Sequence, residues 1–266
     1  MPMPSIETIL GVRFFNGTVD EAVETMSIKG GLLVVPAAPT LVKICYDEGY
    51  RGAVTSADMV IADSGAMVLL WKIFTGRRVE RISGLKFLKR LVARLESQPN
   101  ERVLWIVPTA VAYEKTITWL RSVNLTATAD FYIAPRYAVE VRDDALLAKI
   151  GNPCPTHVVV GIGGGVQEKL GLFLKENLHA RPAIHCIGAA LAFLTGDQPD
   201  SDVGRSFLSR MAAAAASSTA RLWSALFERA ETAVAHFSLS RKFTAVARKM
   251  SNAKGGMRKA NFRIEN

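Results

Sequence analysis

The chain has 266 residues, of which 49% are apolar and 21% charged, and its net charge is +9. This composition supports one large folded domain, or a domain with an appendage, and excludes an intrinsically disordered chain. No apolar run reaches the roughly 18 residues that span a bilayer, and residues 1–10 lack the basic and apolar regions of a signal peptide. We therefore expect a cytoplasmic protein.

Cysteine and histidine are too sparse and scattered to predict a metal site or a disulfide framework. The three cysteines and four histidines have none of the paired spacings that zinc sites use. An odd number of scattered cysteines fits a reducing compartment. We expect neither a metal nor another cofactor.

The first elements have the pattern of alternating strands and helices. Residues 11–15 predict a strand, and Thr18 with Glu21 forms the capping box that begins a helix. Residues 31–35 are a continuous apolar run, typical of a buried parallel strand. The loop that follows leads to another helix and keeps one hydrogen-bonding side chain, Thr40.

The next stretch delivers a carboxylate to the end of a buried strand. The apolar residues 59–62 are followed by Asp63 and by the turn pair Ser64-Gly65, after which apolar residues recur at helical spacing. Open α/β sheets bind ligands at such strand ends, so Asp63 is a candidate catalytic residue. The alternative is that Asp63 only caps the helix.

A polar loop with three arginines comes after that helix. It contains Arg77, Arg78 and Arg81, and it passes through Ser83 into an amphipathic helix that carries leucines at helical spacing. A carboxylate is therefore expected just before this helix, and a group of guanidinium ions just after it.

Further along, a buried strand at residues 157–160 meets a glycine-rich loop that becomes a helix. The loop contains Gly163, Gly164 and Gly165. Backbone N–H groups at such a helix start attract phosphate, although tight backbone packing explains the glycines equally well. The dinucleotide pattern G-x-G-x-x-G fails, because Val166 stands where its last glycine belongs.

Strands are also predicted at residues 103–107 and 131–133, each next to helical patterns. This alternation predicts an α/β fold, Rossmann-like and doubly wound, with a mainly parallel sheet. We expect this domain to cover residues 1–198.

Residues 199–266 differ in composition and are expected to form a basic helical appendage with a frayed end. They hold twelve Lys/Arg and five acidic residues, and therefore seven of the nine net charges. Apolar residues spaced by three or four predict amphipathic basic helices, and one interpretation of such helices is attachment to an anionic membrane surface. The alternative is packing on the core or on another subunit of a homo-oligomer. No nucleic-acid motif accompanies the basic charge.

Asp200-Ser201-Asp202 has the D-x-D form that holds Mg²⁺ or Mn²⁺ in metal-dependent glycosyltransferases. Such acids usually end an apolar strand, whereas this pair follows Gln198-Pro199. We expect a solvated loop here and an enzyme that needs no metal.

Residues 56–88 resemble the WecG/TagA/CpsF family of glycosyltransferases (glycosyltransferase family 26). The family combines an apolar strand, an "A-D-hydrophobic…D-G" segment, a helix and "R-hydrophobic-x-G". The corresponding residues here are Ala57-Asp58, Asp63 with Gly65, and Arg81-Ile82-Ser83-Gly84.

Two later segments extend the resemblance to about residues 11–198, with departures at polar positions. Gln167-Glu168 matches the end of "G-x-P-K-Q-E", but Gly165 and Val166 replace its proline and lysine. Residues 187–196 resemble "G-x-G-A-x-F-D-F-L-x-G", with Ala192 at the aspartate. Ala38 stands in the loop where the family has "T-x-N-P-E".

The resemblance implies transfer of a sugar, of N-acetylmannosamine type, from a UDP-sugar to an undecaprenyl-diphosphate-linked saccharide at the inner membrane face. Inversion needs a base, Asp63, and positive charge near the leaving diphosphate. The candidate substrate-binding residues are Thr40, Ser64, Arg81, Ser83, Gly163, Gly164, Gly165, Gln167 and Glu168. The open alternatives are a nicotinamide-dependent Rossmann-type enzyme and a catalytically weakened scaffold subunit.

Overall fold

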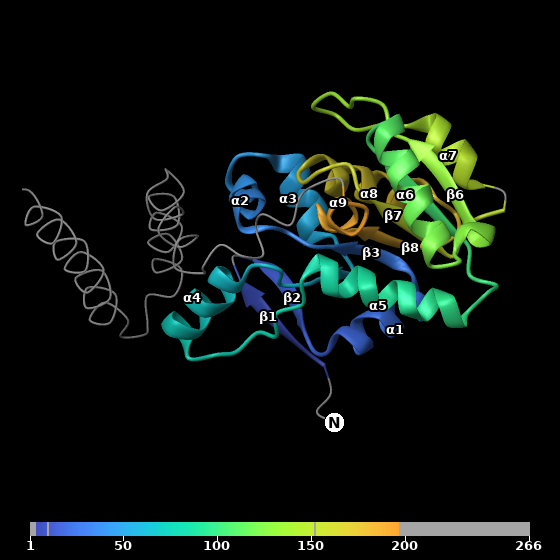
Figure 1. Cartoon of the computed structure of the whole chain (residues 1–266). Helices are drawn as coiled ribbons and strands as arrows, with labels where there is room; N and C mark the ends of the chain where they lie inside the picture. The colour runs from blue at the N-terminus through green and yellow to red at the C-terminus, as the bar shows by residue number, and fades with distance from the viewer. Residues whose placement is uncertain (1–3, 10, 152, 197–266) are drawn as a thin grey trace, which may run out of the picture.

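The computed structural model describes residues 4–9, 11–151 and 153–196, and their core is an eight-stranded mixed sheet (Figure 1). The strand order is β1-β2-β4-β3-β8-β7-β5-β6. Only β1 runs antiparallel to its neighbour, β2, and every other pairing is parallel. The strands are β1 (Ser5–Ile9), β2 (Val12–Asn16), β3 (Gly31–Val34), β4 (Met59–Val60), β5 (Val103–Val107), β6 (Ala129–Ile133), β7 (His157–Val160) and β8 (Ala183–Cys186).

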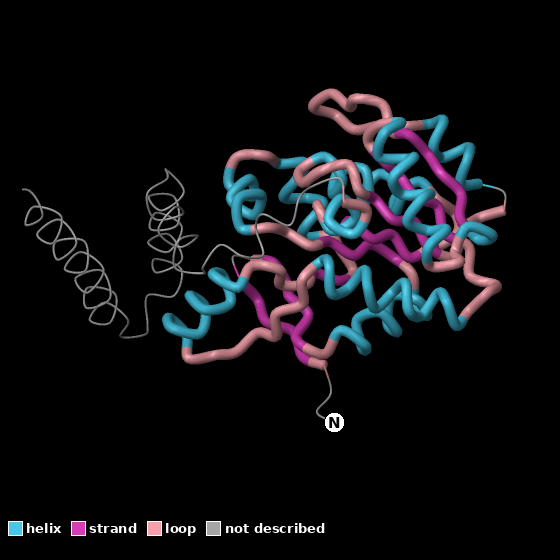
Figure 2. The backbone as a smooth tube through the Cα atoms, viewed as in Figure 1, coloured by secondary structure: helices cyan, strands magenta, loops and turns pink. Residues whose placement is uncertain are grey.

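Helices cover both faces of this sheet, as Figure 2 shows. One apolar cluster joins the sheet to α2, η1, α3, α4, α7 and α8, and a second joins it to α1, α5, α6 and α9. The helices are α1 (Val19–Lys29), α2 (Ala38–Leu41), η1 (Val42–Cys45), α3 (Glu48–Thr55), α4 (Gly65–Thr75), α5 (Gly84–Ser97), α6 (Ala110–Ser122), η2 (Thr126–Thr128), α7 (Asp144–Gly151), α8 (Val166–Asn177) and α9 (Ala190–Leu194).

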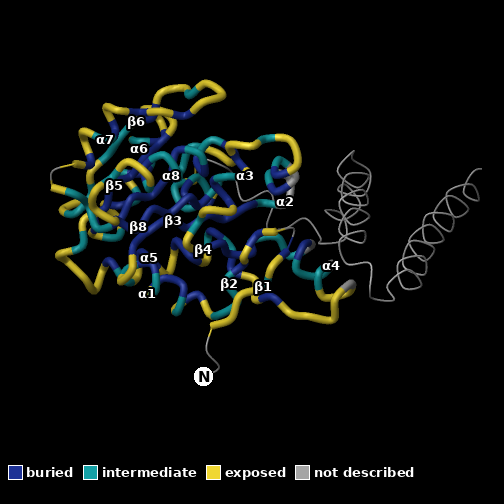
Figure 3. Tube along the Cα trace, turned by 180° about the vertical axis from the view of Figure 1, so that it is seen from behind, coloured by how far each residue is buried: buried dark blue, intermediate teal, exposed yellow. Residues whose placement is uncertain are grey.

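The central strands are buried along their whole length, which explains why their sequences are apolar apart from one buried histidine each in β7 and β8. All residues of β3, β5, β7 and β8 are buried, and Figure 3 shows β3 and β8 in dark blue inside the molecule. A strand with helices on both faces has no solvent side, so its sequence does not alternate. The prediction of an α/β fold with a mostly parallel sheet is therefore confirmed.

The helix starts also agree with their sequence signals. At α1, the Thr18 hydroxyl accepts from the Glu21 N–H at 3.2 Å, and the Glu21 carboxylate accepts from the Thr18 N–H at 2.7 Å. The capping box predicted there is confirmed.

Several elements differ from the sequence expectations. Strand β1 was not expected; most of its residues are at least partly exposed, so it has no apolar run. The run at 59–62 forms only a two-residue strand, and Ala62 instead makes an isolated parallel bridge with Arg81. The segment after Thr40 continues as a 3₁₀ turn, η1, rather than as a long helix.

The predicted appendage, residues 199–266, and the Asp200-Ser201-Asp202 segment lie outside the described residues. In the described part of the chain, no helix is long and apolar enough to cross a membrane. The three cysteines, Cys45, Cys154 and Cys186, are all free thiols.

Candidate active site

The predicted site residues follow three strands, β4, β3 and β7, at the carboxyl edge that they share with β8, which lies between β3 and β7. The chain after β4 passes through α4 to α5, and the loop after β8 leads to α9; α5 and α9 pack on one face. The loops after β3 and β7 lead to α3 and α8 on the other face. Ligands of open α/β sheets bind where neighbouring loops diverge in this way. The fold therefore gathers segments that are far apart in sequence.

Asp63 and Arg81 come together at the end of β4, although 17 residues separate them in the sequence. The Ile82 N–H donates to the Ala62 carbonyl at 3.1 Å, which aligns the two segments. Arg81 Nε donates to the Asp63 backbone carbonyl at 2.7 Å. The Gly84 N–H donates to Asp63 Oδ1 at 3.3 Å. The two halves of the family motif thus form one unit.

The helix-cap alternative for Asp63 is wrong, because its neighbour is the cap. Ser64 Oγ accepts from the Met67 N–H at 3.2 Å and begins α4. Ser83 has the same role at α5, where its Oγ accepts from the Lys86 N–H at 3.1 Å. Both serines lie beside Asp63 or Arg81, and substrate binding by them stays a prediction.

The glycine turn after β7 is pressed against the α2–η1 segment. Gly163 and Gly165 have φ angles of +104° and +96°, in the region that favours glycine. A Cβ on Gly164 would lie 2.8 Å from the Thr40 side chain, and one on Gly165 would lie even closer to the Lys43 ammonium. Close packing on Thr40 accounts for Gly164, and the backbone conformation accounts for Gly163 and Gly165. Phosphate binding by this turn stays a prediction.

Behind the turn, Gln167 and Glu168 are buried, with 0% and 1% of their surface exposed. Glu168 accepts from the Gly165 N–H at 2.6 Å and from Gln167 Nε2 at 3.2 Å. Burial raises the pKa of Glu168, and the hydrogen bond from Gly165 and the charge of Lys43 oppose that rise. The Gly165 N–H is therefore already used, and Glu168 supports the turn from behind.

Gln167 connects the glycine turn to the neighbouring strand end. Its Oε1 has no hydrogen-bond partner among the described residues, and its Nε2 lies 3.9 Å from where a Cβ of Gly188 would be. Gly84, in turn, packs closely against the Ile187 carbonyl. The segments between Asp63 and the glycine turn therefore lie side by side along the carboxyl edge.

The two ends of the site are three strand spacings apart, about 14 Å across the sheet from β4 to β7. Only an extended ligand can contact both ends. Asp63 and Arg81 lie at one end of the site, and the glycine turn lies at the other. This arrangement would suit a ligand that places an electrophilic carbon near Asp63 and a phosphate group near the turn.

Sequence reasoning missed Lys43, which contributes a cation at the glycine turn. It lies three residues after Thr40, so the two side chains share one side of the α2–η1 segment. That spacing was the available signal. Its meaning depended on knowing that this segment packs on the loop after β7.

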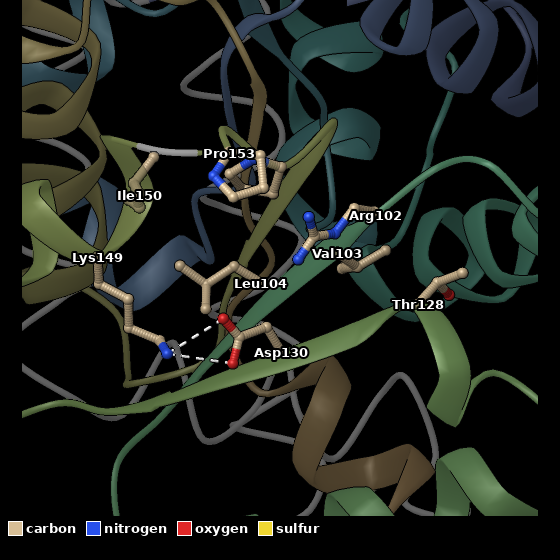
Figure 4. Close-up of a pocket in the computed structure, with 9 residues that line it drawn as sticks. Arg102, Val103, Leu104, Thr128, Asp130, Lys149, Ile150 and Pro153 are labelled. Atoms are coloured by element: carbon tan, nitrogen blue, oxygen red, sulfur yellow. Dashed lines mark hydrogen bonds and ion pairs between the residues drawn. The ribbon is translucent and has the colours of Figure 1, made fainter.

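The pocket in Figure 4 lies at the opposite edge of the sheet. It is lined by the first residues of β5 and β6 and by the end of α7. Lys149 and Asp130 form an ion pair of 3.1 Å within it. None of the predicted site residues lines it, and open α/β sheets bind ligands at the other edge. We therefore place the site at the carboxyl edge.

No group of three or more His, Cys, Asp or Glu side chains that could hold a metal ion occurs within residues 4–9, 11–151 and 153–196. The charged groups at the carboxyl edge come instead from Asp63, Arg81, Lys43 and the buried Glu168. Metal independence itself stays a prediction.

Comparison with known proteins identifies the family of the chain. The model of the glycosyl transferase WecG/TagA/CpsF family matches residues 7–202, which is more than half of the chain and includes every predicted site residue. A search of curated proteins found no match. The chain therefore belongs to the WecG/TagA/CpsF family of glycosyltransferases and is an enzyme.

Proposed function

We propose that this enzyme transfers a sugar of N-acetylmannosamine type from a UDP-sugar to an undecaprenyl-diphosphate-linked saccharide, with inversion at the anomeric carbon. The observation that carries the proposal is the unit formed by Asp63 and Arg81 at the end of β4, on the same sheet edge as the glycine turn. The donor would span the two, with its diphosphate toward the turn and its sugar toward Asp63.

Asp63 is the proposed general base. The acceptor hydroxyl oxygen attacks the anomeric carbon, its proton passes to the Asp63 carboxylate, and the bond from that carbon to the UDP oxygen breaks. The Gly84 N–H donates to Oδ1 of this carboxylate and fixes its orientation. A positioned base of this kind contributes about 10²- to 10⁴-fold to a rate.

The charge that develops on the departing UDP needs positive groups. Arg81 is exposed, and its Nε hydrogen bond to the Asp63 carbonyl fixes the side chain at the site. The glycine turn, supported from behind by the buried Gln167, would orient the donor. A preorganised donor of hydrogen bonds to developing charge is worth about 10²- to 10³-fold in turnover.

The proposed acceptor is a membrane lipid, so the enzyme would work at the cytoplasmic face of the membrane. The support is the charge of the chain after Pro199, with twelve basic residues and five acidic ones. Basic residues near an anionic surface contribute about 1 kcal/mol each.

A thermal-shift screen with UDP-sugars, UDP and NADH tests the donor class. A ligand at about 100 times its dissociation constant raises stability by about 2.7 kcal/mol, which moves the unfolding midpoint measurably. We expect a rise with UDP and with at least one UDP-sugar. A rise with NADH and none with UDP would instead support a nicotinamide-dependent enzyme.

A further inference from the structure

Lys43 occupies the space that a side chain at Gly165 would need. The Lys43 ammonium nitrogen would lie only 2.3 Å from a Cβ on Gly165, far inside contact distance. Thr40 fills the corresponding space over Gly164. The α2–η1 segment thus covers the glycine turn with two side chains, and one of them is a cation.

The two departures from the family signature in this turn fit the position of Lys43. Proline, the family residue at Gly165, has a φ near −65° and cannot adopt the +96° seen here. A side chain at Gly165 would also collide with Lys43. At the next position Val166 replaces the family lysine. The turn itself therefore carries no cation at position 166, and the cation beside it comes from η1.

Lys43 forms no ion pair within the described residues, and its charge acts on the Glu168 and Asp47 carboxylates only from a greater distance. The nearby carboxylate of Asp47 pairs with Lys169 at 2.8 Å. Glu168 accepts from the Gly165 N–H and from Gln167. Because Glu168 takes the Gly165 N–H, the turn has one backbone donor fewer for an anion. The Lys43 ammonium group can take the place of that N–H, because it carries a full positive charge and three N–H donors.

We infer that Lys43 binds the diphosphate of the donor at the glycine turn, in the role that the family lysine would have at position 166. This inference rests on the proposed function, because it takes the turn as the diphosphate end of the site. Gln167 Oε1, buried and without a partner among the described residues, lies behind the same turn.

Calorimetric titration of the full-length protein with UDP tests this role. Lys43→Met should weaken UDP binding about 10- to 100-fold, as expected for a lost charged hydrogen bond. UDP affinity of the variant should also depend less on salt, because one screened charge is gone. The matched control is Lys169→Met, which removes the neighbouring lysine that pairs with Asp47 and should leave UDP affinity unchanged.

Moving the charge separates binding from a structural role. In the double variant Lys43→Met/Val166→Lys, we expect UDP affinity to recover at least in part. If Lys43→Met does not fold, Lys43→Gln serves in its place. Unchanged UDP affinity in the folded Lys43 variant, or no recovery in the double variant, overturns the inference about Lys43 but leaves the proposed function standing. If the wild-type protein does not bind UDP, the proposed function fails and the inference fails with it.

Discussion

Asp63 combines a structural contact with its proposed chemistry. Its Oδ1 accepts the Gly84 N–H at 3.3 Å and so helps to align the start of α5 with the end of β4. An asparagine keeps this acceptor oxygen and the size of the side chain, but it cannot take a proton at neutral pH. The residue therefore allows a substitution that separates the two roles.

We expect Asp63→Asn to fold normally and to lose about 10²- to 10⁴-fold in turnover, the usual cost of a missing general base. Steady-state transfer rates measure the loss, and circular dichroism checks the fold. Ser64→Ala is a useful comparison, because it removes the α4 cap and should cost about 1 kcal/mol of stability. Wild-type turnover in Asp63→Asn would show that the carboxylate has only its structural contact.

At the scale of elements, β7 and β8 share a buried pair of histidines on the face that α5 covers. His157 Nδ1 and His185 Nε2 lie 3.0 Å apart, and both residues have 0% exposed surface. His157 Nε2 contacts Glu101 Oε2 at 3.1 Å, and Glu101 pairs with Arg94 of α5. Burial lowers the pKa of both histidines, and for His157 the Glu101 carboxylate opposes this shift.

This pair predicts a loss of stability on mild acidification. The unfolded chain binds protons on these histidines near pH 6.5, whereas the folded chain resists binding them. The stability they contribute is thus complete above about pH 6.5 and declines below it, by up to about 1.4 kcal/mol per pH unit for each proton. Urea unfolding at pH 7.5, 6.5 and 5.5 measures this slope.

The substitution His185→Gln should flatten the slope, because one buried titrating group is removed. His179→Gln is the matched control, since His179 is exposed, and it should leave the slope as in the wild type. An equal slope in the wild type and in His185→Gln would mean that other groups cause the acid sensitivity.

The elements also show how far sequence reasoning reached. Strands β3, β5 and β7 were predictable because burial on both faces makes them continuously apolar. Strand β1 was not, because an exposed edge strand carries no such run.

Asp63 and Arg81 were proposed as site residues from the order of motifs along the chain. Lys43 was missed because its contact with Gly165 depends on the packing of α2–η1 against α8, which local spacing does not encode.

At the scale of the whole molecule, the proposed chemistry uses protein cations in place of a metal. Arg81 and Lys43 supply positive charge at the two ends of the site. We therefore expect EDTA to leave transfer activity nearly unchanged. Loss of activity in EDTA, its recovery with Mn²⁺, and its loss in Asp200→Ala would together assign a metal to the D-x-D segment.

The basic charge after Pro199 leads us to expect that this segment attaches the enzyme to an anionic membrane. Deletion of residues 205–266 should abolish co-sedimentation with anionic liposomes and transfer to a lipid-linked acceptor, while some UDP binding remains. The full-length protein should leave the liposomes as salt rises, because the Debye length shortens to about 3 Å at 1 M. If the full-length protein ignores anionic liposomes at low salt, or the truncated protein unfolds, the segment belongs to the core or to a subunit interface.

Sugar transfer by the full-length enzyme tests the central claim most directly. The enzyme is incubated with UDP-sugars, including UDP-N-acetylmannosamine, and with an undecaprenyl-diphosphate-linked saccharide. Released UDP is quantified, and the lipid is weighed by mass spectrometry. The account predicts UDP and a lipid heavier by one sugar in equal amounts, with both products strongly reduced in Asp63→Asn. Folded enzyme that releases no UDP from any of these donors, or that forms product equally well without Asp63, would contradict it.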